Sequence, residues 1–272
     1  EKDPKGNYTL IWETYPEIDN VPAEIFISDN DSVFPASPSM TANSNDYITV
    51  IENLTDSVEK RKYFRVKIEG TMSNIITNRY FELDSVQNFR DIGGYVTSDN
   101  RRVRWGKIFR SGSCSRMTQN DRLELNRLGI KTIIDVRSED VKKKQLIRFP
   151  QSNNIRIPIA HNGYSLISQK VMAGEFLRGD AIIYTQDTYR DMVNNFSKEY
   201  AQLFDYLCDE KNYPIVFHFY LGKDQSGLAT FFLLRALDVP MDVIEDDYME
   251  SDALINRAKL VRNADSLSES RQ

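Results

Sequence analysis

The sequence predicts a chain in two parts, a small all-β sandwich followed by an α/β region built on a mostly parallel sheet. About the first 80 residues contain short runs of β-branched and aromatic residues, separated by turn-forming stretches. From about residue 84 onward, short apolar strands alternate with helical segments, which is typical of a parallel sheet flanked by helices. The length of 272 residues fits one large or two modest domains. We therefore predict domains at 1–83 and 84–272.

In the first part, four runs have the composition and length of β-strands, and several alternate polar and apolar residues. They are Tyr8–Trp12, Glu24–Ser28, Tyr47–Ile51 and Tyr63–Ile68. No segment here shows a long 3.6-residue period. Short strands at this spacing predict a small sandwich of the immunoglobulin or fibronectin type, with Asn78–Leu83 as its last strand.

In the second part, the expected elements alternate in type. The strands are Lys131–Val136, Ile155–Ile159 and Pro214–His218, and the helices are Gln119–Leu128, Asp187–Cys208, Gly227–Leu237 and one or two within Met241–Arg262. Gly129 stands where a glycine commonly ends a helix. The polar tail 264–272 is expected to fray.

The composition narrows the classes of function. A net charge of −5 argues against a broad nucleic-acid surface, although it allows a local pocket for one phosphate. The two cysteines form no CxxC or Cys/His cluster, so we expect no disulfide framework, no metal site and no cofactor. No apolar run approaches the roughly 20 residues that span a bilayer. No signal peptide is visible, and the compartment stays open because a removed export signal would leave the same picture.

The most informative segment is 216–227, which follows an apolar strand and opens an apolar helix. Gly222 and Gly227 allow the backbone N–H groups of such a loop to turn inward at the helix N-terminus. That geometry binds anions. A plain strand-to-helix turn would need glycines as well, so the loop alone leaves both interpretations open.

The loop residues resemble a known family. The run His218-Phe-Tyr-Leu-Gly-Lys-Asp-Gln-Ser-Gly227 is similar, without a gap, to the phosphate loop His-Cys-x-x-Gly-Lys-Asp-Arg-Thr-Gly of bacterial cysteine-dependent tyrosine phosphatases. Five positions match and a sixth is a conservative Ser-for-Thr replacement. The matches are His218, Gly222, Lys223, Asp224 and Gly227, and the replacement is Ser226.

Further motifs resemble the same family in the expected order, over about residues 84–255. They are Asn88–Gly94, Arg104–Gly112, Ile134–Arg137 and Asp247-Tyr248. The resemblance implies a phosphatase-like sheet flanked by helices and a bacterial source. Some members carry an extra N-terminal β domain, which suggests a periplasmic or secreted protein.

Two departures from the family pattern bear on activity. Phe219 stands at the position of the nucleophilic cysteine, and Gln225 at that of the phosphate-clamping arginine. In the family, a thiolate attacks phosphorus and the arginine fork stabilises the transition state. Phenylalanine has no nucleophilic atom, and glutamine lacks the charged bidentate fork. We therefore predict an inactive pseudophosphatase; the alternative is an active protein-tyrosine or phosphoinositide phosphatase with an atypical nucleophile, for which Asp224 is the candidate.

The loop could still bind a phosphorylated or acidic ligand, and the β domain could bind a protein partner. The candidate ligand-binding residues are His218, Gly222, Lys223, Asp224, Ser226, Gly227 and Arg110. The structural alternative is that arginines of these motifs tie loops together through carboxylates such as Asp91 and Asp135. We favour it for Arg137 and for His218, and leave it open for Arg110. The acidic run 245–247 is interpreted as a solvated helix face, Cys114 lies outside the loop, and Cys208 is expected in the core.

Overall fold

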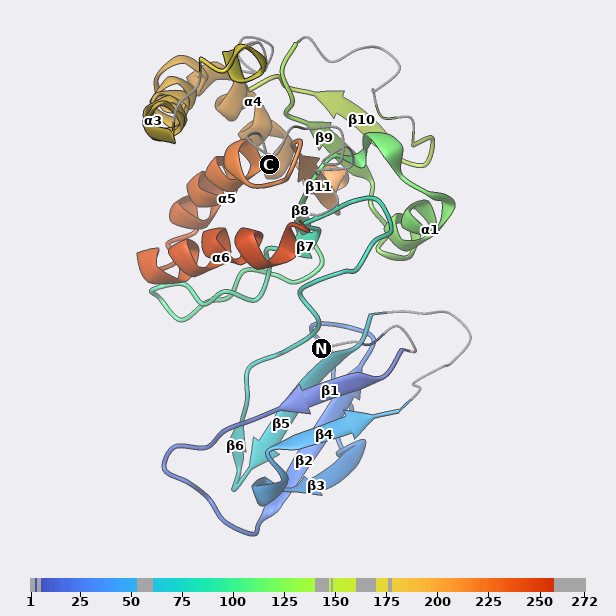
Figure 1. Cartoon of the computed structure of the whole chain (residues 1–272). Coiled ribbons are helices and arrows are strands. Elements are labelled where there is room, and N and C mark those ends of the chain that lie inside the picture. Colours follow the sequence, from blue (N-terminus) through green and yellow to red (C-terminus); the bar gives the residue numbers. More distant parts are fainter. Residues whose placement is uncertain are drawn as a thin grey trace.

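The computed structural model describes residues 3, 6–52, 61–139, 147, 149–159, 170–175 and 178–256. Figure 1 shows a β-rich end formed by strands β1 to β6 and a mixed end in which helices surround a second sheet. Within the described residues, no helix has the length and apolar character needed to cross a membrane.

The β-rich end contains two antiparallel sheets. Strand β1 (Tyr8–Ile11) pairs with β4 (Ile48–Ile51), and the other sheet has the order β3-β2-β5-β6. The bounds of its strands are β2 Pro22–Ser28, β3 Met40–Asn43, β5 Tyr63–Ile68 and β6 Thr71–Met72. Inward-facing side chains of both sheets, among them Leu10, Ile25 and Phe64, form one apolar cluster. The four strands expected in this part are confirmed.

The strand expected at Asn78–Leu83 is wrong. Within this range the only described pairing is an isolated bridge between Tyr80 and Arg90. The backbone there bonds toward the second sheet, since the Phe81 N–H donates to the Phe89 carbonyl. The Phe81 ring packs edge-on against the rings of Phe89 and Phe109. This segment therefore belongs by its contacts to the α/β end of the chain.

The second sheet has five strands in the order β10-β9-β11-β8-β7. Their bounds are β7 Arg90–Asp91, β8 Ile108–Ser111, β9 Thr132–Asp135, β10 Asn153–Arg156 and β11 Ile215–His218. Four of them run parallel and β7 is antiparallel to β8, which confirms the mostly parallel sheet. Successive residues of β11 face opposite sides, so that Phe217 joins one core and Val216 the other.

Helices cover both faces of this sheet (Figure 1). Helix α1 (Gln119–Arg127) packs on one face through Leu125, and α4 (Ser197–Cys208) and α5 (Asp224–Ala236) pack on the other. Helix α6 (Met241–Leu254) lies beside α5. A single helix over Met241–Arg262 is wrong, because α6 ends at Leu254 and Ile255 is extended, with φ −93° and ψ 110°. A second helix after residue 256 and the frayed tail fall outside the described residues.

The single helix expected over Asp187–Cys208 is instead two helices, α3 (Arg178–Asn195) and α4. The break is at Phe196, whose backbone leaves the helical region at φ −117° and ψ 26° while its side chain enters the main core. Burial of this aromatic ring therefore outweighs continuity of the helical pattern. Gly129 follows α1 with φ +66°, the left-handed conformation expected of a helix-ending glycine.

A buried ion pair connects the two ends of the molecule. Arg61, just before β5, pairs with the fully buried carboxylate of Asp91 in β7. Its guanidinium carbon also lies 5.2 Å from the ring centroid of Trp105. Asp91 further accepts a hydrogen bond from the Gly106 N–H at 2.7 Å. The β-rich end is thus anchored to β7, the edge strand of the second sheet.

Candidate functional site

The loop that resembles a phosphate loop lies at the carboxyl edge of the parallel sheet. Strand β11 ends at His218 and helix α5 begins at Asp224, so residues 219–223 form the connection. Gly222 has φ +70°, and a Cβ there would lie only 2.4–2.5 Å from backbone atoms of Ser111 and Gly112. Only glycine fits this close approach without displacement of the backbone.

The carbonyl groups of the loop point toward the buried interior of the protein, where two side chains hold them. Asn88 Nδ2 donates to the Leu221 carbonyl at 3.1 Å and to the Gly222 carbonyl at 2.9 Å. Arg110 Nη2 donates to the carbonyls of Gly222 and Lys223 at 2.9 and 3.2 Å. Within the described part of the chain, the N–H groups of Leu221, Gly222 and Lys223 donate to no other residue. These N–H groups and the N-terminus of α5 can together face an anion.

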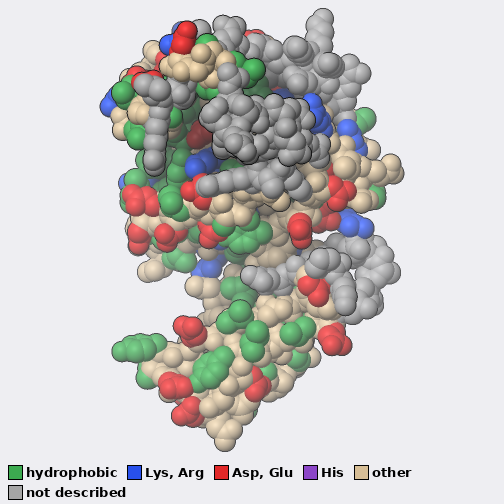
Figure 2. Space-filling view, in the orientation of Figure 1, with side chains coloured by type: hydrophobic (Ala, Val, Ile, Leu, Met, Phe, Trp, Pro, Cys, Tyr) green, Lys and Arg blue, Asp and Glu red, His purple; other side chains and the backbone are tan. Residues whose placement is uncertain are grey.

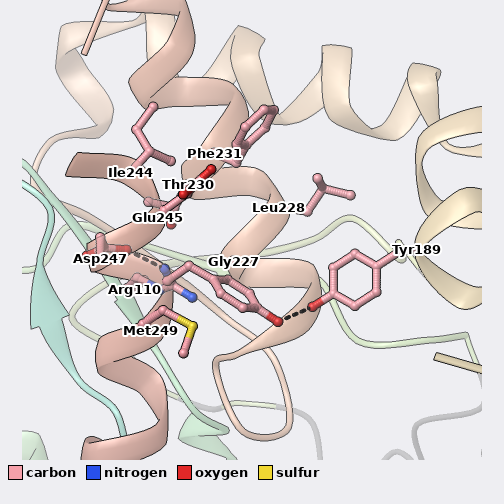
Figure 3. A pocket seen from close by; sticks show the side chains of 11 residues that line it. Arg110, Tyr189, Gly227, Leu228, Thr230, Phe231, Ile244, Glu245, Asp247 and Met249 are labelled. Carbon is pink, nitrogen blue, oxygen red and sulfur yellow. Dashed lines mark hydrogen bonds and ion pairs between the residues drawn. The ribbon is translucent and has the colours of Figure 1, made fainter. Parts of the chain in front are cut away.

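A buried cluster of two arginines and one aspartate supports this arrangement. Asp247 of α6 accepts from Arg110 Nη1 at 2.6 Å and from Arg90 Nε at 3.1 Å, and all three side chains are at most 1% exposed. Figure 3 shows the bond between Arg110 and Asp247. Burial opposes ionisation of Asp247, but the charges of Arg110 and Arg90 lower its pKa to about 2. Burial lowers the pKa of Arg110 to about 10, so the guanidinium is still charged at neutral pH.

The role of Asp247 corrects the expectation of a solvated acidic run. Glu245 and Asp246 are exposed, whereas Asp247 is buried at the centre of the arginine cluster. A signal was present in the sequence: Asp247 follows Ile244 by three residues and precedes Ser251 by four, so the three share one helical face. All three side chains are buried.

At the cysteine position, Phe219 has joined the hydrophobic core. Its side chain is 1% exposed and belongs to the same apolar cluster as Phe217 and Ala229. Its ring lies edge-on to the ring of Tyr220, with centroids 4.9 Å apart. The position therefore offers no atom that could attack phosphorus.

Three polar side chains before and after the loop are buried and have polar atoms without hydrogen-bond partners among the described residues. Gln225 Oε1, Ser226 Oγ and both ring nitrogens of His218 have no hydrogen bond within the described residues. Burial lowers the pKa of His218 to about 4, although the Asp135 carboxylate is 3.7 Å away, so the imidazole is neutral at pH 7. Buried polar groups are normally paired, and three orphaned side chains in one strand–loop–helix segment are unusual.

The charged side chains of Lys223 and Asp224 are partly exposed, and each has a partner. Lys223 Nζ is 2.7 Å from an Asp252 carboxylate oxygen, and this hydrogen bond raises the pKa of the lysine. Asp224 accepts a hydrogen bond from the Tyr189 hydroxyl at 2.8 Å, and that hydroxyl lies 2.7 Å from the Tyr248 hydroxyl. Burial, followed by the charge of Asp224, raises the pKa of Tyr189, which keeps the phenol protonated.

Other candidates lie away from the loop backbone. Arg137 pairs with Asp135 at 2.7 and 2.8 Å, and both are buried, as expected for a structural tie. Cys114 is buried, and burial raises the pKa of its thiol to about 12, which keeps it protonated. Cys208 is exposed, so its expected place in the core is wrong: it is the last residue of α4, one position after the buried Leu207. Both cysteines are free.

Comparisons with known proteins identify a family and several relatives. A family model described as "Tyrosine phosphatase family" matches residues 81–271. A protein of Cupriavidus necator, provisionally named a tyrosine-protein phosphatase, is 29% identical over 187 residues, which is 66% of this chain and 67% of the relative. The triple specificity protein phosphatase PtpB of Mycobacterium tuberculosis is 25% identical over 194 residues, or 62% of this chain and 68% of the relative.

Among solved structures, the core catalytic domain of the PP-IP phosphatase SIW14 from S. cerevisiae, solved with citrate, is 15% identical. It covers 58% of this chain and 74% of its own, with a TM-score of 0.36, too low to support a conclusion. The family model spans most of the chain and includes every motif around the loop. The chain belongs to the tyrosine phosphatase family.

Proposed function

We propose that this protein is a pseudophosphatase that binds a phosphorylated ligand at the 219–227 loop and does not hydrolyse it by the cysteine route. The observation that carries the proposal is Phe219, whose side chain is buried in the core at the position of the nucleophile. Loss of a nucleophile can cost on the order of 10⁶ in rate, judged from another enzyme. Replacement of the clamping arginine by Gln225 removes a further source of transition-state stabilisation.

Binding is supported by the backbone of the loop. Asn88 and Arg110 hold the loop carbonyls toward the buried interior of the protein. The N–H groups of the loop and the N-terminus of α5 are then left for an anion. The nearby cations are already paired, Arg110 with Asp247 and Lys223 with Asp252. Affinity then rests mainly on neutral N–H donors, so we expect a dissociation constant on the order of 1 mM, or about −4 kcal/mol.

The alternative of an active phosphomonoesterase rests on Asp224 as an atypical nucleophile. Its carboxylate already accepts a hydrogen bond from Tyr189, which lowers its availability for attack. Turnover of a phosphotyrosine peptide that disappears in Asp224→Asn would establish this alternative. Turnover that persists in Asp224→Asn would point to a contaminant or to another group.

For the β-rich end, we propose an immunoglobulin- or fibronectin-like domain, with β1 to β6 as its strands, that binds a protein partner in a secreted or periplasmic protein. The expected boundary at residue 83 moves toward the N-terminus, because Phe81 packs against the second sheet. On the outer face of the β1–β4 pair, Ile11, Ile48 and Val50 are exposed. Residues 6–52 contain no lysine or arginine and eight acidic residues: Glu13, Glu17, Asp19, Glu24, Asp29, Asp31, Asp46 and Glu52. Two of these, Glu24 and Asp29, pair with Lys67 and Lys62 of the same end. Figure 2 shows the resulting apolar and acidic surface at this end. Such a surface fits a partner with an apolar centre and a basic rim.

The ligand proposal is tested by nuclear magnetic resonance of the ¹⁵N-labelled chain, titrated with inorganic phosphate and with phosphotyrosine. We expect saturable shifts of the Gly222 and Lys223 amide signals and little change in β1 to β6. The matched variant Gln225→Arg should tighten binding about tenfold or more, because a charge-assisted hydrogen bond contributes about 1.5–3 kcal/mol. Loop signals that never move, in the parent and in the variant, would overturn the proposal.

A further inference from the structure

A cavity lies between α5 and α6, with Tyr189 of α3 at one side (Figure 3), and it is also lined by Gly227 and Arg110. Its volume is about 340 Å³. Most of its wall is apolar, from Leu228 and Phe231 of α5 and from Ile244, Tyr248 and Met249 of α6. The N–H groups of Leu221, Gly222 and Lys223, on which the proposed phosphate binding rests, belong to residues that do not line this cavity.

We propose that this cavity binds a neutral, planar aromatic molecule of two fused rings that carries one N–H or O–H donor. The volume sets the size, since an apolar cavity of about 150 Å³ in another protein holds one benzene ring. The cavity here has about twice that volume and lies within the usual range of ligand pockets, roughly 300–1,000 Å³.

The aromatic character follows from the wall. Tyr189, Phe231 and Tyr248 supply ring faces and edges, and Met249 supplies a thioether, which makes favourable contacts with rings. The two tyrosine hydroxyls bond to each other, and Tyr189 bonds to Asp224, so these rings are fixed before a ligand enters. A preformed wall reduces the entropy lost on binding.

The charge of the ligand follows from the lining side chains. Arg110 and Asp247 both line the cavity and pair with each other at 2.6 Å, so their opposite charges offset each other within the wall. Glu245 also lines the cavity and is exposed, which places a carboxylate at its rim. This carboxylate can accept a hydrogen bond from a ligand donor and disfavours an anion.

Indole is a suitable probe, and 1-methylindole is its matched partner because it has the same rings without the donor. The reporter is the methyl resonance of Met249, with Met40 of β3 as the remote control, in the full chain labelled at methionine methyl groups. We expect indole to move the Met249 signal saturably while that of Met40 stays fixed. Indole should bind about tenfold more tightly than 1-methylindole, and 1-naphthoate should not bind, since the bond to Glu245 is lost or replaced by repulsion.

Two variants test the site. Leu228→Trp fills the cavity and should weaken indole at least about tenfold. Glu245→Ala, at an exposed position, removes the acceptor and should bring the indole to 1-methylindole ratio close to one. Asp246→Ala, at an exposed neighbour outside the cavity lining, should leave the ratio unchanged. The proposal is overturned if Met249 shows no saturable shift, if 1-naphthoate binds as well as indole, or if Glu245→Ala leaves the ratio intact.

Discussion

The buried frame beneath the loop and the residues at its centre differ in how completely their polar groups are paired. In the frame, Asp247 is bonded by two arginines, and Asn88 and Arg110 hold the loop carbonyls. Among the described residues, the buried side-chain polar atoms of these four residues all have partners except Arg110 Nε. At the centre, Gln225, Ser226 and His218 have buried polar atoms without partners beside an apolar Phe219. The frame determines the shape of the loop, and the centre would determine its chemistry. The loop backbone is thus held by buried, mostly paired groups, while its central side chains contribute an apolar ring and unpaired polar atoms.

The largest effect is expected from Asp247→Ala, which leaves Arg90 and Arg110 buried without their carboxylate. Breaking a buried pair in this way costs about 3–5 kcal/mol, so the free energy of unfolding should fall by that amount. The measurement is equilibrium denaturation. Asp252→Asn is the control, because its partly exposed pair with Lys223 should contribute less than about 1 kcal/mol. Similar losses in the two variants would contradict the role of the frame.

His218 makes the centre sensitive to acid. Its folded pKa of about 4 lies below its ordinary value of 6.5, so the unfolded chain binds the proton first as the pH falls. The penalty is absent above pH 6.5 and grows as the pH falls to 4, to a total on the order of 3 kcal/mol. The stability difference between the parent and His218→Gln should change by this amount over that window. A difference that is constant with pH would show that His218 is not buried in its neutral form.

Alanine substitutions at two glycines with left-handed backbones distinguish the cost of backbone strain from the cost of steric overlap. Gly129→Ala should cost about 1–2 kcal/mol, because φ is +66° and nothing lies within 4 Å of the new methyl group. Gly222→Ala should cost about 2 kcal/mol more, because its methyl group would overlap the backbone at Ser111 and Gly112. Thermal and chemical denaturation of both variants give the comparison. Equal costs would mean that the loop does not pack against Ser111 as described.

The smallest effect is expected from Tyr189→Phe, which removes the hydrogen bonds to Asp224 and Tyr248. The loss of stability should be about 1 kcal/mol. Tyr15→Phe, at a fully exposed side chain, should change stability by only a few tenths of that amount. If the alternative of catalysis by Asp224 were correct, Tyr189→Phe would instead raise phosphoester turnover by freeing the carboxylate.

Sequence reasoning found the loop and most elements because their signals are local. Strand β11, Gly222 and helix α5 are consecutive in the chain, and the composition of each is distinctive. Strand β3 was not predicted, since Met40–Asn43 is short and follows a turn-forming stretch. Its pairing with β2 is a tertiary contact that a local pattern does not record.

The frame was harder to predict because its members are far apart in sequence. Asp247 lies 137 residues from Arg110 and 157 from Arg90. Composition alone predicts that the acidic run 245–247 is a solvated face, and this is correct for Glu245 and Asp246. Asp247 differs because its position on the helix faces the interior. The error at Asn78–Leu83 has a similar cause, because the composition predicts an extended segment but not the sheet it contacts.

The central claim is that the scaffold lacks only the reactive groups at 219 and 225. The most direct test is hydrolysis of a phosphotyrosine peptide and p-nitrophenyl phosphate by the parent chain and by Phe219→Cys/Gln225→Arg, with Phe219→Ser/Gln225→Arg as the matched control. We predict no turnover by the parent or the serine control, and measurable turnover by the cysteine double variant. Turnover by the purified parent, or an inactive double variant that is folded, would contradict the claim.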